Sequence, residues 1–235
     1  MNLHKKKIIE LINRLGYKHS QWKVFADFIE IAAITISNSI DIKNFDEREK
    51  RYLQIVKEYT KEEFEIFSSI FAELVLALEQ EITDILGEIY MELNLSNKWS
   101  GQVFTPIQLS KLMGKISVKG IKESIEKDGF VTVSEPTCGG GSILIGLALA
   151  IQEEGFNYQD SMVVTAVDLD IKAVYMCYVQ LSLLGIPGVI LHGNTIAVEV
   201  FSQWKTPTYI LGDWSFKEKN NRVRKAIKED LKLVV

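Results

Sequence analysis

Three consecutive glycines at positions 139–141 separate two apolar runs, and this junction constrains the fold more than any other feature of the sequence. The run before it, residues 130–135, is short and rich in β-branched residues, which predicts a buried strand. The run after it, residues 141–154, predicts an apolar helix. Glycine at such a junction permits positive φ and close approach to a ligand, and the first helical turn presents free N–H groups. The sequence therefore predicts a strand–turn–helix unit with a possible ligand site at the turn.

The same alternation continues toward the C-terminus. We expect further strands at residues 162–170, 188–194 and 208–213, and helices at residues 171–185 and 216–234. Strands and helices that alternate at this length are typical of a parallel sheet covered by helices. This part of the chain is therefore predicted to be α/β.

The first part of the chain has a different pattern. Residues 1–96 contain no proline, and their apolar residues recur at helical spacing. Thr60 and Glu63 form a capping-box pattern ahead of one such segment. We therefore expect an all-helical domain over residues 1–97, with a scaffolding or partner-docking role, and an α/β domain over residues 98–235.

Composition excludes several classes of protein. No stretch reaches the eighteen apolar residues of a membrane span, and the N-terminus lacks the apolar run of a secretory signal. The two cysteines, Cys138 and Cys177, lack metal-type spacing, and three histidines are too few for a histidine cluster. We expect a protein of the reducing cytoplasm that has no metal and no membrane contact.

Polar residues follow the predicted strands. Asp168 ends the second strand, about 20–30 residues after the glycines, where an acid can accept hydrogen bonds from ribose hydroxyls. Asp170 suits the cap of the next helix, which leaves Leu169 free to pack on an adenine ring. Asn194 follows the third strand and could contact the adenine edge, although an Asn after a Gly is more often a turn residue. The glycine pattern is neither G-x-G-x-x-G nor a Walker loop, which argues against a dinucleotide or a nucleoside triphosphate.

A further short segment, "GQVFTP" at residues 101–106, precedes the first strand. Thr105 suits a helix N-cap and Pro106 the first helical position, so the segment could simply begin a helix. Alternatively it could close over the tail of a cofactor, with Phe104 as a wall.

Taken in order, "GQVFTP", "EPTCGGG", "VDLD" and "HGNT" resemble the motifs of the N6-adenine DNA methylase family. The similarity is greatest to modification subunits of type I restriction systems and to related enzymes of mobile elements. It covers about residues 98–216 and implies a partial, Rossmann-like S-adenosylmethionine-binding sheet, C-terminally short and preceded by a helical bundle. By motif, the implied cofactor-binding residues are Phe104, Thr105, Pro106, Glu135, Cys138, Gly139, Gly141, Asp168, Leu169 and Asn194.

The catalytic motif of that family is Asn/Asp-Pro-Pro-Tyr/Phe at the tip of the fourth strand. Its polar side chain and a loop carbonyl orient the target amine in line with the methyl donor, and its ring stacks on the flipped base. In "GDWSF" the resemblance makes Asp213 the acceptor and Phe216 the ring. Trp214 and Ser215 replace both prolines, so the implied motif is degenerate.

The resemblance implies methyl transfer from S-adenosylmethionine to the N6 amine of adenine in DNA. No segment resembles the target-recognition domain of the family, and the net charge is −4, so we expect a separate subunit or an oligomer to supply DNA recognition. Two alternatives remain. One is a catalytically degenerate S-adenosylmethionine-binding or interaction module, and the other is methylation of an amine outside DNA.

Overall fold

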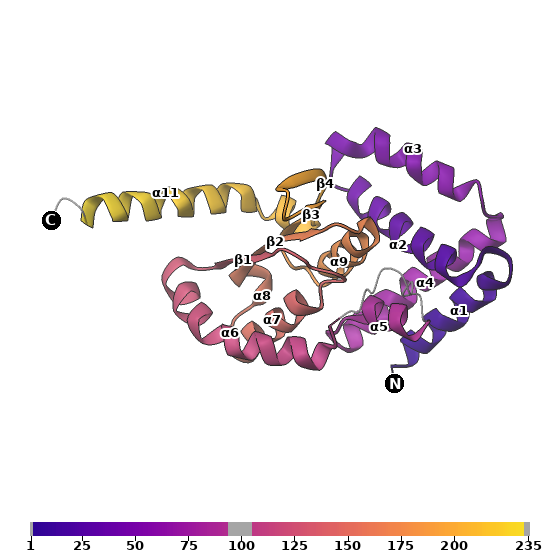
Figure 1. Ribbon diagram of the computed structural model, residues 1–235, viewed down its shortest axis with the longest axis horizontal. Helices are drawn as coiled ribbons and strands as arrows, with labels where there is room; N and C mark the ends of the chain where they lie inside the picture. The colour runs from indigo at the N-terminus through magenta and orange to yellow at the C-terminus, as the bar shows by residue number, and fades with distance from the viewer. Residues whose placement is uncertain (1, 94–104, 233–235) are drawn as a thin grey trace.

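The computed structural model describes residues 2–93 and 105–232, which form a mixed α/β molecule with a four-stranded sheet (Figure 1). The first half is helical: α1 (Leu3–His19), α2 (Gln21–Asn38), a 3-10 turn η1 (Ile42–Asn44), α3 (Phe45–Val56), α4 (Lys61–Gln80) and α5 (Ile85–Glu92). The second half contains helices α6 (Ile107–Asp128), α7 (Ser142–Glu153), α8 (Tyr158–Ser161), α9 (Ile171–Leu183), α10 (Pro207–Leu211) and α11 (Trp214–Lys232). Its strands are β1 (Val131–Glu135), β2 (Met162–Asp168), β3 (Gly188–Asn194) and β4 (Glu199–Lys205). No helix in these ranges is long and apolar enough to cross a membrane.

The sheet has the order β1-β2-β3-β4, with the first three strands parallel and β4 antiparallel to β3. Three of the four expected strands are thereby confirmed. In the register, Glu135 pairs with Ala166 and Asp168 pairs with His192, so the ends of β1, β2 and β3 lie along one edge of the sheet. We call this the carboxyl edge, and the opposite edge, where these three strands begin, the amino edge.

The strand predicted at residues 208–213 is wrong. Pro207–Leu211 is helix α10, because the Thr206 side chain accepts a hydrogen bond from the Tyr209 N–H and Pro207 occupies the first turn. The fourth strand, β4, comes earlier and forms a hairpin with β3. A short apolar run does not distinguish a strand from a helix by periodicity, and here the Thr-Pro start signal decides.

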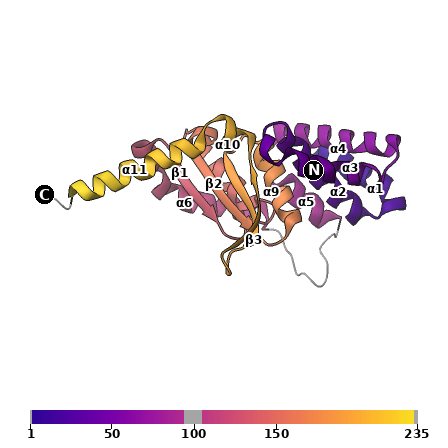
Figure 2. The same ribbon diagram turned by 90° about the horizontal axis from the view of Figure 1, so that it is seen from above.

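The hairpin carries the chain back to the amino edge. There Thr206 donates its N–H to the Gly188 carbonyl at 3.0 Å, and its hydroxyl accepts the Gly188 N–H at 2.9 Å. Trp214 packs edge-on against Phe130, with ring centroids 5.2 Å apart, and belongs to the same small apolar cluster as Val163. Helix α11 begins at this cluster and then extends away from the sheet (Figures 1 and 2).

One continuous hydrophobic core joins the N-terminal helices to the sheet. Buried side chains of α1, α2, α4 and α5 belong to the same cluster as those of α7, α9 and β2. From α3, the Arg48 guanidinium stacks on the Trp204 ring of β4 at 3.9 Å and donates to the Gln203 carbonyl at 2.8 Å. The division into domains 1–97 and 98–235 therefore stays a prediction.

Helices α6 and α7 are in backbone contact where two glycines meet. A Cβ atom on Gly114 would lie 2.5 Å from the Gly146 carbonyl oxygen, so the helices can approach this closely only because a side chain is absent. Beside this contact, the hydroxyls of Ser110 and Ser142 are 2.9 Å apart, and that of Ser142 donates to the Thr105 carbonyl at 2.9 Å. The contact thereby holds the segment before α6 against the start of α7.

Two glycines of α6 provide a matched test of this contact. We expect Gly114→Ala to lower the free energy of unfolding by about 1–3 kcal/mol, because the new methyl group overpacks the interface. Gly120→Ala should raise it by about 0.5–1 kcal/mol, because nothing lies within 4 Å of that position and alanine favours the helix. Urea unfolding of the two variants measures both changes, and equal effects would contradict a close contact at Gly114.

Candidate functional site

The glycine turn between β1 and α7 has a defined backbone conformation. Gly139 has φ of 52° and Gly141 has φ of 96°, values that side chains rarely allow. The Cys138 N–H donates to the Val167 carbonyl at 2.8 Å, and the Gly139 N–H donates to Asp168 Oδ2 at 2.9 Å. The turn is therefore held against the end of β2.

Asp168 and its neighbours form the next part of the carboxyl edge. Asp168 Oδ1 accepts the Asp170 N–H at 2.9 Å, so both oxygens of Asp168 hold the backbone. A carboxylate has about four acceptor positions, and these two bonds use two of them. The Asp170 side chain accepts the Lys172 N–H at 3.0 Å, which confirms the predicted cap of α9. Leu169 is 62% exposed at the same edge.

The β3–β4 hairpin adds the third part. Asn194 Oδ1 accepts hydrogen bonds from the N–H groups of Ile196 and Ala197 at 3.0 and 3.1 Å. Asn194 is therefore a turn residue that stabilises the hairpin through its side-chain carbonyl. The next residue, Thr195, donates its hydroxyl to the Pro136 carbonyl at 2.6 Å. This bond brings the hairpin to the end of β1, so the tips of the three parallel strands lie together.

The remaining predicted residues of the turn have local partners. Glu135 Oε1 accepts the Thr137 N–H at 3.1 Å at the end of β1. The side chain of Cys138 is buried against Cys177 of α9. This thiol and burial raise the pKa of Cys177 well above its usual value. Cys138 can therefore offer only its backbone at the carboxyl edge. Among the described residues, no group of three or more His, Cys, Asp or Glu side chains could hold a metal ion.

A cavity of about 450 Å³ lies between α5 and the start of α6. Thr105 and Pro106 of the "FTP" segment line it, together with Lys5 of α1 and Glu88 of α5. The N-cap of α6 is Pro106, so the expectation that Thr105 caps the helix is wrong by one residue. Phe104 lies outside the described residues.

Two polar residues that the sequence did not single out connect this cavity to the glycine turn. Asp84, 3% exposed, lines the cavity, and Oδ1 of Asp84 accepts the Gly87 N–H at 2.8 Å. Gln180 of α9, 0% exposed, donates Nε2 to Asp84 Oδ1 and to the Gly140 carbonyl, both at 2.8 Å. Burial raises the pKa of Asp84, and the hydrogen bonds from Gln180 and Gly87 oppose this rise. The only signal in the sequence was Asp84 before an apolar run, a pattern typical of an N-cap.

The predicted catalytic residues do not join this site. Asp213 lies between α10 and α11 with φ of 50°, next to Trp214 of the amino-edge cluster. Phe216, two residues further along α11, is 58% exposed. A strand as long as β2 spans about 20 Å, so the structure places this pair about one strand length from the carboxyl edge. The expected position, at a strand tip beside the cofactor residues, is wrong because α10 replaces that strand.

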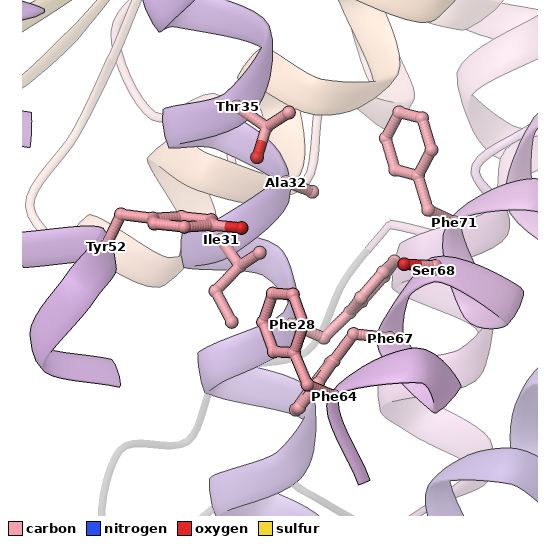
Figure 3. Close-up of a pocket in the computed structure, with 9 residues that line it drawn as sticks. All are labelled: Phe28, Ile31, Ala32, Thr35, Tyr52, Phe64, Phe67, Ser68 and Phe71. Carbon is pink, nitrogen blue, oxygen red and sulfur yellow. The ribbon is translucent and has the colours of Figure 1, made fainter. Parts of the chain in front are cut away.

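A second cavity, of about 210 Å³, lies within the N-terminal helices and away from the glycine turn. Figure 3 shows its aromatic lining, in which rings from α2, α3 and α4 surround the space. Its walls include Phe28, Tyr52, Phe64, Phe67 and Phe71. Lining of this kind offers apolar contact and no acid, so the polar site of the carboxyl edge is the better candidate for chemistry.

Comparison with known proteins gives an independent result. A sequence model of the family described as N-6 DNA Methylase matches residues 81–233. No curated protein matches the chain. The matched range is more than half of the chain and contains Asp84, the glycine turn, Asp168 and Asn194. The chain therefore belongs to the N-6 DNA methylase family.

Proposed function

We propose that the protein is an S-adenosylmethionine-dependent methyltransferase that acts on the N6 amine of adenine in DNA. The observation that carries the proposal is the carboxyl edge, where the glycine turn, Asp168 and Asn194 come together in a chain of this family. Ligands of sheets with parallel strands and crossover helices bind at this edge. Family membership makes a methyl donor the fitting ligand.

The residues present fit S-adenosylmethionine. The remaining acceptor positions of Asp168 suit the two ribose hydroxyls, and exposed Leu169 suits one face of the adenine ring. With Oδ1 occupied by the hairpin, Asn194 would use its Nδ2 group to donate to the adenine edge. Gly139 and Gly141 leave room for the sulfur-bearing tail to lie on the backbone of the turn. We propose on this basis a Rossmann-like cofactor site.

S-adenosylmethionine supplies a methyl group that is already activated by its sulfonium, so the protein's contribution is to position donor and acceptor. The glycine turn and Asp168 would position the methyl donor, and the N-terminus of α7 would offer it further N–H groups as hydrogen-bond donors. Formation of the bond from the amine nitrogen to the methyl carbon would break the carbon–sulfur bond, with its electron pair left on sulfur, and the amine would release one proton to solvent. We propose that the side chain which orients this amine is supplied by the partner that brings the DNA to the carboxyl edge.

A partner for DNA recognition follows from charge. The chain has 27 basic and 31 acidic residues, and a protein that binds DNA unaided usually presents a basic face. We therefore propose that a recognition subunit or an oligomer brings the adenine to the site. Base flipping would then deliver it to the carboxyl edge.

A second candidate function is favoured by the position of Asp213 and Phe216. Because this pair lies at the amino edge, the catalytic motif implied by the sequence is not beside the proposed cofactor site. A module that binds S-adenosylmethionine without transferring its methyl group would have this arrangement. Measured methyl transfer separates the two candidates.

The two aspartates of "VDLD" test the cofactor site. Asp168→Ala should weaken binding of S-adenosylhomocysteine about tenfold or more, since it removes a charged acceptor and releases Gly139. Asp170→Ala should keep the affinity but lower the stability by about 1 kcal/mol, since it removes the cap of α9. Calorimetry and thermal unfolding measure the pair. Unchanged binding in Asp168→Ala would reject the proposed site.

Transfer of labelled methyl from S-adenosylmethionine to DNA, with and without the product of a neighbouring gene, tests the activity itself. We expect labelled N6-methyladenine, with RNA as the comparison substrate. Cofactor binding without transfer to either nucleic acid would support the binding module, and transfer to RNA alone would reject DNA as the substrate.

Asp213→Asn tests the sequence-based catalytic assignment. Asparagine tolerates the positive φ at this position, so the variant removes the charge without straining the backbone. Because Asp213 lies about one strand length from the carboxyl edge, we expect methyl transfer at the parent rate. A decrease of 100-fold or more in the rate of methyl transfer, with S-adenosylhomocysteine binding retained, would show that Asp213 takes part in the reaction.

A further inference from the structure

Asp84 is a buried acid, and the described residues supply no cation among the groups that act on its charge. These groups are the amide of Gln180, the N–H of Gly87 and the carboxylate of Glu88. Lys5 lines the same cavity, but its ammonium pairs with Glu88 at 3.0 Å and with Glu92 at 3.2 Å. Buried carboxylates are usually paired with a cation or a metal, so this one has the environment of a ligand group.

The position of Asp84 connects the two parts of the site. It forms part of the wall of the 450 Å³ cavity, and a Cβ atom on Gly140 would lie 3.4 Å from Asp84 Oδ1. Asp84 therefore lies between the cavity and the glycine turn. Ile107 and Gln108, in the first turn of α6, line the same cavity. Backbone amides of a first helical turn favour an anion. The cavity therefore combines Asp84, which suits a cation, with the first turn of α6, which suits a carboxylate.

We propose that Asp84 binds the α-ammonium group at the amino-acid end of S-adenosylmethionine, and that this end occupies the cavity between α5 and α6. The inference rests on the proposed cofactor site and extends it to residues of the N-terminal helices. An α-amino acid carries an ammonium, which suits Asp84, and a carboxylate, which suits the first turn of α6. At a site that excludes water, a charged hydrogen bond to Asp84 is stronger than at the surface.

Glu135 is the competing acid, because the family resemblance places it beside the methionine moiety. Its Oε1 accepts the N–H of Thr137, within the same turn. It is also half-buried, whereas Asp84 is 3% exposed. Folding has already removed Asp84 from water, and attraction between opposite charges is stronger where solvent screens it less, so an ammonium gains more at Asp84 than at Glu135.

Two ligands isolate the amino-acid end. S-adenosylhomocysteine carries the α-ammonium and the carboxylate, while 5′-methylthioadenosine has the same nucleoside and thioether without them. Calorimetry with both ligands is done on the parent, Asp84→Asn and Glu135→Gln, and thermal unfolding checks the fold of each. Asparagine can keep both acceptor bonds of Asp84 Oδ1, so the variant removes the charge and leaves the cap of α5 in place.

We expect Asp84→Asn to weaken the binding of S-adenosylhomocysteine about 10- to 100-fold. The affinity for 5′-methylthioadenosine should change less than twofold. An equal loss for both ligands would show that Asp84 only supports the fold, and no loss for either would remove it from the site. If Glu135→Gln alone abolishes the preference for S-adenosylhomocysteine, the ammonium belongs to Glu135. Each of these outcomes overturns the inference and retains the proposed function. If neither ligand binds the parent, the cofactor site itself is rejected.

Discussion

The structure depends on one buried amide, that of Gln180. Its Nε2 donates to the Asp84 carboxylate and to the Gly140 carbonyl, and its Oε1 accepts the Leu86 N–H at 3.0 Å. One side chain thus satisfies an acid, a carbonyl and an amide that would each be costly to bury alone. Because these groups belong to the N-terminal helices and to the glycine turn, neither can be positioned without the other. The helical half therefore takes part in positioning the glycine turn.

The path of the chain after β3 separates two regions that the sequence pattern joins. The antiparallel return of β4 brings Thr206 to the start of β3, and Trp214 then closes the amino edge over Phe130. The loops of the proposed cofactor site lie at the other edge. In this family member, the aromatic segment after the sheet packs as a small apolar core, and the carboxyl edge is left to the turn, Asp168 and the hairpin.

What could be predicted from the sequence was local. The glycine turn, three strands, the capping box at Thr60 and the cap at Asp170 depend on residues a few positions apart, and all are confirmed. The strand predicted at residues 208–213 is a helix because its apolar residues fit either period, and the Thr-Pro start signal just before it favours a helix. Asp84 and Gln180 could not be found, because their bond joins residues 96 positions apart and only tertiary packing brings them together. The domain boundary predicted at residue 97 rests on a change in the spacing of apolar residues. The hydrophobic core contains side chains from both sides of this position.

The hydrogen bonds of the glycine turn have a consequence for recognition. Glycine gives the most conformational freedom to an unfolded chain, so a turn of three glycines would usually be ordered by its ligand at the expense of affinity. Here the Cys138 N–H, the Gly139 N–H and the Gly140 carbonyl are all bonded to the protein itself. The entropy of the turn is lost when the chain folds, so the turn is preorganised. A ligand that binds at this edge would therefore not have to order the turn.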